Sequence, residues 1–576
     1  MTTALGRTMT RRTWFLALAL AALAGLAAFV VVGRGEQGDV GAAPAPGSRP
    51  VPYGDVPEGL GTPSGEEPGS ASSPRLAWGP TEADLAQGVA DAAALPLERV
   101  AGSVIVARYA GPDATAIASQ ITDLGLAGAI LFGDNVTGVD QVRTTTAQLA
   151  DAGAADGRTW PVVVAVDQEG GLVQRLGLPF TQFPSFSAAG AAGDETVVRE
   201  AAEARASELR AAGFTMNFAP VADVTIGPAD PTIGSRSAGS APDAVARIAG
   251  AESAGSLDAG ILPAVKHFPG HGSVTVDSHA ELPVQGASTA ELEARDLVPF
   301  ADAVDTGAPM IMMGHIAVTA WQPGVPASLS APAYAYLRES LGFTGVAVTD
   351  GLDMGGVTAG RAPGQASVEA LAAGADLLLT PVDSVAARQA IIDAVGSGTL
   401  SRARLDEAAG RVITMMRWQE TLASRAQDTT PVGPGTIGSA GSAARALSDA
   451  AVTVLTGQCT GSLVGDRIRL VGGGSAVQEA FAAAAERGGL VVAAPGAAAD
   501  SEVRLVTGTT TALGGDVAVA LDVPYVLETS NAPVKIAAYG RDAGTLDTLV
   551  AVLRGHQPAL GHLPVAVGAY PVGTGC

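Results

Sequence analysis

Cysteine is almost absent from this 576-residue sequence, which contains only two, Cys459 and Cys576. No closely spaced cysteine pair exists, so a cysteine-based metal centre is excluded. In an exported protein the two residues can form a disulfide that ties the C-terminus back to the body, and two free thiols are the alternative.

Positive charge is also scarce. The chain has 34 Lys and Arg against 57 Asp and Glu, for a formal net charge of −23. No basic stripe stands out against this background, so nucleic acid is excluded as a partner. The acidity is interpreted as a contribution to solubility. The sequence carries no signal for an oligomeric state.

Apolar residues make up 47% of the chain and charged residues only 16%, which is typical of a globular protein. A chain of 576 residues is too long for one ordinary core, so two or more domains are expected.

The N-terminus has the pattern of a targeting segment. Arg7, Arg11 and Arg12 precede an uncharged apolar run that lasts to Val32 and is long enough to cross a bilayer. The positive flank predicts a cytoplasmic N-terminus and an exported remainder, and Thr10-Arg11-Arg12 resembles a twin-arginine signal. We therefore expect residues 1–33 to be a signal or anchor segment, cleaved or uncleaved, and the only membrane contact. No cysteine follows the run, which excludes a lipid anchor there.

The middle of the chain alternates short β-rich apolar runs with segments of helical spacing. This pattern implies parallel strands joined by crossover helices, and eight such units predict a (β/α)₈ TIM-type barrel. A doubly wound open sheet is the alternative. The eight runs are 103–107, 129–132, 162–166, 215–221, 261–267, 310–313, 345–349 and 375–380.

Composition predicts the domain limits. Residues 34–80, rich in Gly, Pro, Ser and Glu, are expected to form a flexible linker, followed by the barrel over 81–425. A second linker over 426–440 then leads to a smaller α/β sandwich domain over 441–576, in which α/β alternation resumes without a catalytic cluster.

Histidine is rare but clustered. Three of the six histidines lie between Lys266 and His279, in a segment that begins as a strand and becomes a loop at Pro269 and Gly270. Other polar residues follow other predicted strands, and in a barrel these ends meet at one catalytic face. They are Asp167, Asp223, His315 and Asp350, whereas Asp376 lies at the start of the eighth run. Carboxylates and cations on several walls suit a polyhydroxylated ligand.

These segments, taken in order, resemble glycoside hydrolase family three, closely its β-N-acetylglucosaminidase (β-N-acetylhexosaminidase) branch. The resemblance is strong over residues 90–420. It rests on Asp-Gln-Glu-Gly-Gly from Asp167, Asn-Phe-Ala-Pro-Val from Asn217, Arg236-Ser237, Lys-His-Phe-Pro-Gly-His-Gly from Lys266, Asp277-Ser278-His279, and Thr-Asp-x-Leu-x-Met from Thr349. The region after residue 441 resembles the family's second domain more weakly.

The resemblance implies a role for each matching residue. Asp350 is the expected catalytic nucleophile, His279 the acid/base and Asp277 its dyad partner. The expected sugar-binding residues are Asp167, Arg175, Arg236, Lys266 and His267. The sequence departs from the family pattern at Ser273, Val274, Ala238 and Gly351, which affects substrate fit more than chemistry. No metal or cofactor is expected.

The expected activity is retaining hydrolysis that removes terminal non-reducing N-acetylglucosamine from peptidoglycan or chitin-type oligosaccharides outside the cytoplasm. Three alternatives remain. They are a β-glucosidase or β-xylosidase of the same family, a non-catalytic cell-wall-binding protein, and a zinc hydrolase using His267, His271, Asp277 and His279.

Several neighbouring polar residues are interpreted differently. Four of them are expected to be structural: His271, Asp223, Asp353 and Asp376. For His315, a place in the pocket wall and a place in the core are equally expected. The methionines at 310, 312 and 313 are expected in the barrel core.

Overall fold

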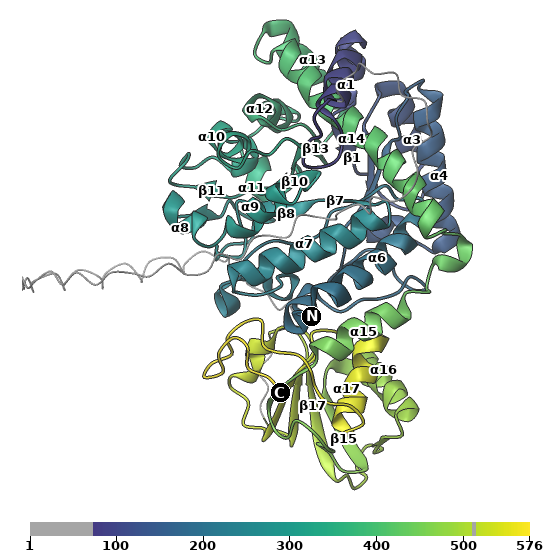
Figure 1. Cartoon of the computed structure of the whole chain (residues 1–576), viewed down its shortest axis with the longest axis vertical. Helices are drawn as coiled ribbons and strands as arrows, with labels where there is room; N and C mark the ends of the chain where they lie inside the picture. The colour runs from purple at the N-terminus through teal and green to yellow at the C-terminus, as the bar shows by residue number, and fades with distance from the viewer. Residues whose placement is uncertain (1–72, 510–513) are drawn as a thin grey trace, which may run out of the picture. The chain divides into compact units, whose positions relative to one another are not determined.

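The computed structural model describes residues 73–509 and 514–576 (Figure 1). The predicted signal or anchor segment, 1–33, and residues 34–72 of the predicted linker lie outside this range. Over the described residues, no helix combines the length and apolar character needed to cross a bilayer.

Each of the eight predicted apolar runs overlaps an observed strand. The fifth run holds two short strands, β7 and β8, separated by one residue. The strands are β1 (Ile105–Ala107), β2 (Gly128–Leu131), β3 (Val163–Val166), β6 (Met216–Asn217), β7 (Leu262–Pro263), β8 (Val265–Phe268), β10 (Met310–Met313), β12 (Val346–Thr349) and β13 (Leu378–Leu379).

Parallel pairing closes these strands into a ring. One sheet has the order β13-β1-β2-β3-β6-β7 and another the order β12-β10-β8. Parallel bridges from Val221 to Lys266 and from Val348 to Leu377 join the two sheets at both ends. The circle confirms the predicted TIM-type barrel against the doubly wound alternative.

Both faces of the barrel strands are buried, which explains their continuous apolar runs. Met310 and Met312 belong to the core inside the ring, whereas Ile311 and Met313 belong to the core between strands and helices. The surrounding helices include α3 (Thr115–Leu124), α4 (Val139–Ala155), α6 (Glu195–Ala211), α7 (Pro242–Asp258), α9 (Val298–Asp305), α12 (Gln365–Ala373), α13 (Ser384–Ser397) and α14 (Arg402–Thr429).

Packing extends beyond the predicted barrel limits at both ends. Trp78, inside the predicted linker, is buried and meets Trp418 edge-on at 5.9 Å between ring centroids. Helix α1 (Glu82–Ala94) then packs along α14, which continues past residue 425 to Thr429. α14 therefore extends into the range predicted as the second linker, and α15 (Gly441–Ala451) starts where the second domain was expected.

The C-terminal domain is an α/β sandwich around a six-stranded sheet of order β14-β19-β18-β17-β15-β16. Only the pair β14–β19 is antiparallel. Its elements are β14 (Thr453–Thr456), β15 (Arg467–Gly472), α16 (Gly474–Arg487), β16 (Val491–Val492), β17 (Ser501–Val506), β18 (Val517–Ala520), β19 (Val534–Ala537) and α17 (Ala543–Leu553).

Alternate residues of β18 enter two different cores. Val517 and Val519 pack with Phe481 of α16 and residues of α17. Ala518 and Ala520 pack on the opposite face with Ala188 and Ala191 of α5 (Phe186–Ala192), a barrel-domain helix. The core on the second sheet face is therefore shared between segments of the C-terminal domain and α5 of the barrel domain.

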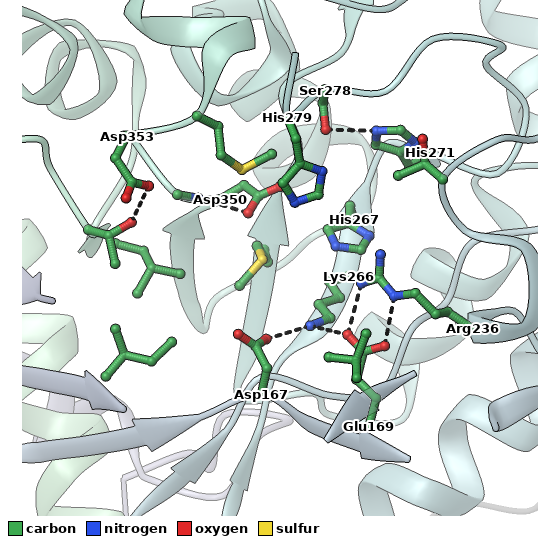
Figure 2. Close-up of a pocket in the computed structure, with 18 of the residues that line it drawn as sticks. Asp167, Glu169, Arg236, Lys266, His267, His271, Ser278, His279, Asp350 and Asp353 are labelled. Carbon is green, nitrogen blue, oxygen red and sulfur yellow. Dashed lines mark hydrogen bonds and ion pairs between the residues drawn. The ribbon is translucent and has the colours of Figure 1, made fainter. Parts of the chain in front are cut away.

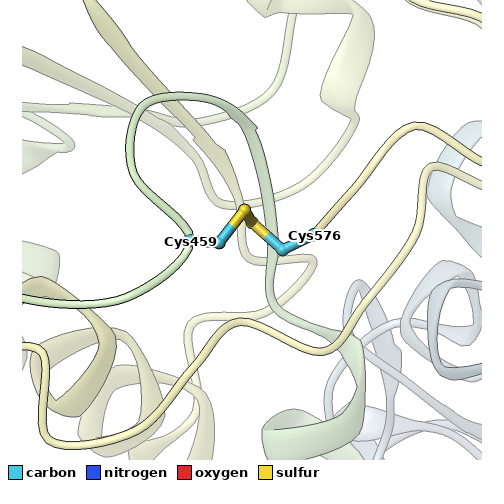
Figure 3. Close-up of a disulfide and its surroundings, with 2 residues drawn as sticks. All are labelled: Cys459 and Cys576. Carbon is cyan, nitrogen blue, oxygen red and sulfur yellow. A yellow bond between two sulfur atoms is a disulfide. The ribbon is translucent and has the colours of Figure 1, made fainter.

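Cys459 and Cys576 form a disulfide with 5.5 Å between their Cα atoms (Figure 3). It links the loop after β14 to the last residue of the sequence, across 117 residues. Of the two possibilities that the sequence left open, the structure contains the disulfide.

Candidate active site

A cavity of about 380 Å³ opens where the barrel strands end (Figure 2). Its lining includes residues that follow β1, β3, β8 and β12, which places them at the carboxyl face of the barrel. Of the residues proposed from the sequence, the cavity is lined by Asp167, Arg175, Arg236, Lys266, His267, His279 and Asp350. Asp277 is not in the wall and instead bonds His279.

One wall is a network of buried charges. Lys266 Nζ lies 2.8 Å from Asp167 Oδ1 and 2.6 Å from Glu169 Oε1. Arg236 binds both oxygens of Glu169 at 2.8 Å, as Figure 2 shows. This bidentate contact holds the Arg236 guanidinium in one orientation. The network supplies a fixed set of donors and acceptors at the side of the cavity.

The network also fixes the ionisation of its members. Burial favours neutral Glu169, but Arg236 and Lys266 outweigh it and hold the pKa of this carboxyl well below its usual value. Burial likewise favours neutral Lys266, but Asp167 and Glu169 outweigh it and raise the pKa of the ammonium. Glu169 and Lys266 therefore remain charged at neutral pH.

Asp350 directly follows β12, on a turn that two hydrogen bonds stabilise. Its backbone N–H donates to Met313 O at 2.9 Å, and the N–H of Gly351 donates to its Oδ1 at 2.7 Å. Burial raises the pKa of Asp350, but His315, His267, the Gly351 N–H and Lys266 outweigh this effect and lower the pKa to about 2. The Asp350 side chain is therefore a carboxylate at neutral pH.

His315, which the sequence left between wall and core, lies fully buried beneath this turn. Its Nε2 is 2.8 Å from Gly351 O, and a carbonyl can only accept, so Nε2 carries the proton. Its Nδ1 lies 2.7 Å from Ser328 Oγ. His315 therefore links Ser328 to the residue beside Asp350.

Asp223 anchors the base of the histidine-rich loop. Its carboxylate lies 2.7 Å from His267 Nδ1 and accepts from the backbone N–H of His271 at 2.6 Å. Burial raises the pKa of Asp223, but His267 and His271 outweigh it and lower the pKa. His271 Nε2 in turn lies 2.9 Å from Ser278 Oγ, which connects the base of the loop to its tip.

His279 lies at the loop tip with its side chain 63% exposed. Its Nδ1 is 2.7 Å from Asp277 Oδ1, which also accepts the His279 backbone N–H at 2.9 Å. Burial raises the pKa of Asp277, but these contacts with His279 outweigh it and lower the pKa. The Asp277 contact uses Nδ1, so Nε2 is the ring nitrogen left for a ligand.

The four residues of the zinc alternative do not form one site. His267 Nδ1 binds Asp223, and His271 Nε2 binds Ser278. Over the described residues, no group of three or more His, Cys, Asp or Glu side chains is arranged to hold a metal ion.

Sequence reasoning missed part of the cavity wall. Arg108, after β1, lies 4.7 Å above the Phe132 ring and binds Asp353 at 2.8 Å. Asp353, interpreted from sequence as structural, lines the cavity, as does Arg108. Arg175 lies 5.6 Å from the same Phe132 ring, and its buried Nε has no protein partner. A search for polar residues after every predicted strand would have found Arg108.

A TIM-type barrel with a carboxylate, an imidazole and a wall of fixed cations and anions around one cavity has the fold and site of a carbohydrate-active enzyme. The family model for the N-terminal domain of glycosyl hydrolase family 3 matches residues 98–415. The chain belongs to this family and is a glycoside hydrolase.

Named relatives agree with this assignment. Beta-hexosaminidase LpqI of Mycobacterium tuberculosis is 33% identical over 372 residues, covering 62% of this chain and 92% of that protein. Beta-hexosaminidase A of Pseudoalteromonas piscicida is 34% identical over 283 residues, but the match spans only 46% of this chain and 47% of that protein.

A solved structure extends the likeness to both domains. The family 3 β-N-acetylglucosaminidase from Paenibacillus sp. str. FPU-7 superposes with a TM-score of 0.72 at 28% identity. The match covers 83% of this chain and 100% of that chain, so it includes the second domain as well as the barrel.

Proposed function

We propose that this glycoside hydrolase is a retaining β-N-acetylhexosaminidase. It removes terminal non-reducing N-acetylglucosamine from peptidoglycan fragments or chitin-type oligosaccharides. The observation that carries the proposal is that Asp350 and His279, from the ends of different strands, line one cavity. Support for the sugar comes from relatives named β-hexosaminidase and a structural neighbour named β-N-acetylglucosaminidase.

In the first step, an Asp350 oxygen attacks the anomeric carbon. The bond from that carbon to the leaving oxygen breaks, and His279 Nε2–H gives its proton to this oxygen. The products are a covalent glycosyl-enzyme and the free aglycone. The low pKa of Asp350, about 2, supports the nucleophile role because the group is already ionised.

In the second step, His279 Nε2 takes a proton from water, and the water oxygen attacks the anomeric carbon. The Asp350–sugar bond breaks and the sugar leaves with the same anomeric configuration. Asp277 bonds Nδ1 of His279 and stays ionised, so it orients the ring and leaves Nε2 directed away from this contact. Lys266, Arg236 and Asp167 are proposed to hold the sugar hydroxyls, as are Arg175 and His267.

The first test measures hydrolysis by the full chain. We expect release of 4-nitrophenol from its N-acetyl-β-glucosaminide, with much slower release from the β-glucoside and β-xyloside. A faster β-glucoside or β-xyloside would overturn the sugar assignment and favour the alternative activity within the family. An enzyme with intact fold and no turnover would instead favour a cell-wall-binding protein.

The second test separates the two catalytic roles. His279→Ala should lose about 10²- to 10⁴-fold in kcat/KM on glycosides with poor leaving groups and much less on a 2,4-dinitrophenyl glycoside. His556→Ala, a change at an exposed histidine of the C-terminal domain, is the matched control and should retain full activity. Equal losses of His279→Ala on both substrates would contradict the acid role.

Asp350→Ala should abolish turnover. If this variant still formed a covalent glycosyl-enzyme detectable by mass spectrometry, the nucleophile would be another residue.

We also propose that the enzyme acts outside the cytoplasm, either anchored to the membrane or secreted. The support is the arginine-flanked apolar run of residues 1–33 in the sequence. Fractionation of cells that express the full chain tests this, and enzyme retained in the cytoplasm would contradict it.

A further inference from the structure

The position of His279 relative to Asp350 must be set by the loop backbone. The His279 ring is largely exposed, and its partner, Asp277, belongs to the same loop. That bond orients the ring within the loop, but it does not fix the loop against the barrel. Contacts from outside the loop must therefore hold the loop against the barrel.

Two backbone contacts connect the tip to the chain segment that follows Asp350. The N–H of Gly355 donates to His279 O at 3.1 Å, and the N–H of Gly356 donates to Ser278 O at 3.1 Å. Gly355 and Gly356 begin α11 (Gly355–Thr358), where backbone N–H groups have no partner within the helix. The histidine loop therefore caps the helix that follows Asp350.

The closeness of the two backbones requires glycine at position 355 and leaves little room for a larger residue at position 356. A Cβ on Gly355 would lie 2.7 Å from the carbonyl oxygens of both His279 and Ala280. A Cβ on Gly356 would lie 3.0 Å from Ser278 O. The first distance forces the backbones apart, and the second requires a shift of a few tenths of an ångström.

The loop also has contacts within itself and with Asp223. Asp223 holds its base, and His271 holds Ser278, whose side chain is buried. His279 and Ala280, by contrast, are exposed. The two glycine contacts are thus the links that join the exposed tip directly to the segment after Asp350.

We propose that Gly355 and Gly356 are positioning residues that hold the His279 loop against the segment after Asp350, so that the acid and the nucleophile address the same glycosidic bond. This inference rests on the proposed function for its catalytic part. Its structural part, that the two glycines hold the loop against the segment after Asp350, does not depend on that function.

The catalytic part is tested with Gly355→Ala. We expect kcat/KM on phenyl N-acetyl-β-glucosaminide to fall about tenfold to a hundredfold, with at most a twofold fall on the 2,4-dinitrophenyl glycoside, because only the former needs the acid. Gly356→Ala should show the same selectivity with a smaller loss. Gly396→Ala, in α13 with no atom within 4 Å of the new Cβ, is the matched control and should behave as wild type.

The structural part is tested by hydrogen–deuterium exchange over residues 274–281. We expect faster exchange in Gly355→Ala and Gly356→Ala than in wild type and Gly396→Ala, with unchanged exchange in α13. Unchanged exchange in both glycine variants, or equal losses on both glycosides, would overturn the inference. If Gly355→Ala fails to fold, the milder Gly356→Ala decides both readouts.

The two proposals fail in different ways. A wild-type chain that hydrolyses no N-acetylglucosaminide defeats the proposed function, whereas the exchange experiment still decides whether the glycine pair holds the loop. Active wild type combined with unselective glycine variants defeats only the inference.

Discussion

His315 supports the turn of Asp350 without being part of the cavity wall. Its two ring nitrogens connect Ser328 to Gly351 O, so the ring acts as a rigid spacer beneath the turn. Full burial means that removing it leaves a carbonyl and a hydroxyl without water to replace the lost bonds.

We therefore predict that His315→Ala lowers kcat by about a hundredfold with little change in KM, because the carboxylate is misaligned while the sugar-binding wall is intact. The free energy of unfolding should fall by about 2 kcal/mol. Steady-state kinetics and urea unfolding measure the two effects. Ser328→Ala, which keeps the bond to Gly351, should lose much less activity, and a rise in KM at constant kcat would contradict the positioning role.

The motifs of the sequence were enough to find the principal groups of the site. The resemblance to the family selected Asp350, His279 and the cations from the sequence, and the structure places these side chains around one cavity. The sequence did not define the relations among them. The bidentate contact of Arg236 with Glu169 and the capping of α11 by the histidine loop both depend on how distant segments pack.

At the scale of elements, a single carboxylate fastens the outer helices to the barrel. Asp376, just before β13, is completely buried and accepts from the backbone N–H of Ala347 at 3.0 Å. It also pairs with Arg338, with Arg404 at 2.9 Å and with Arg411 at 3.4 Å. The last two belong to α14, so the cluster joins this helix to the strands.

Asp376→Asn should reduce the free energy of unfolding by about 3 kcal/mol at neutral pH, because three partly buried guanidinium groups lose their shared counter-charge. Urea unfolding followed by circular dichroism measures this loss. Asp466→Asn breaks the pair with Arg554, in which the Asp466 side chain is 94% exposed, and should cause no measurable loss. Equal effects of the two substitutions would contradict the argument.

The same cluster predicts a dependence on pH. Burial raises the pKa of Asp376, but Arg338, Arg411, Arg404 and the Ala347 N–H outweigh this effect and lower the pKa below its usual value. A lowered pKa in the folded state adds stability above about pH 4, the pKa of an unfolded aspartate, and this stability is lost as the pH falls further.

The stability difference between wild type and Asp376→Asn should therefore be constant between pH 5 and 7 and shrink below about pH 4. Urea unfolding at a series of pH values measures it. A difference that grows on acidification would show that the carboxyl is not held ionised by the arginines.

Element types were easier to predict than their limits. All nine barrel strands overlap the eight predicted runs, because strands buried on both faces must be apolar throughout. The run 215–221 yielded only β6, Met216–Asn217, since Pro220 cannot donate to a neighbouring strand and the chain leaves regular pairing. Helix α14 runs to Thr429, past the predicted barrel limit at residue 425, because packing, not composition, decides where a helix stops.

At the scale of the whole chain, the disulfide closes a long segment of the C-terminal domain. Cys459 follows β14, an edge strand, and Cys576 follows the bridge between His562 and Gly575. The crosslink therefore restricts the unfolded C-terminal domain more than it adds contacts to the folded one.

We predict that Cys576→Ser lowers the free energy of unfolding of the C-terminal domain by about 2–4 kcal/mol, with kcat/KM unchanged, because every cavity residue lies in the barrel. Urea unfolding with and without a reductant measures the effect. Wild type in reductant should match the variant, and a variant as stable as oxidised wild type would contradict the prediction.

The alanine face of β18 has a practical consequence for protein engineering. One design for a shortened enzyme ends the chain after α14, at Thr429, and removes the C-terminal domain. Such a truncation would remove the C-terminal part of the core that Ala188 and Ala191 share with Ala518 and Ala520, and would expose apolar surface of α5 to water. A usable minimal enzyme would need polar replacements along α5 before it could be concentrated or crystallised.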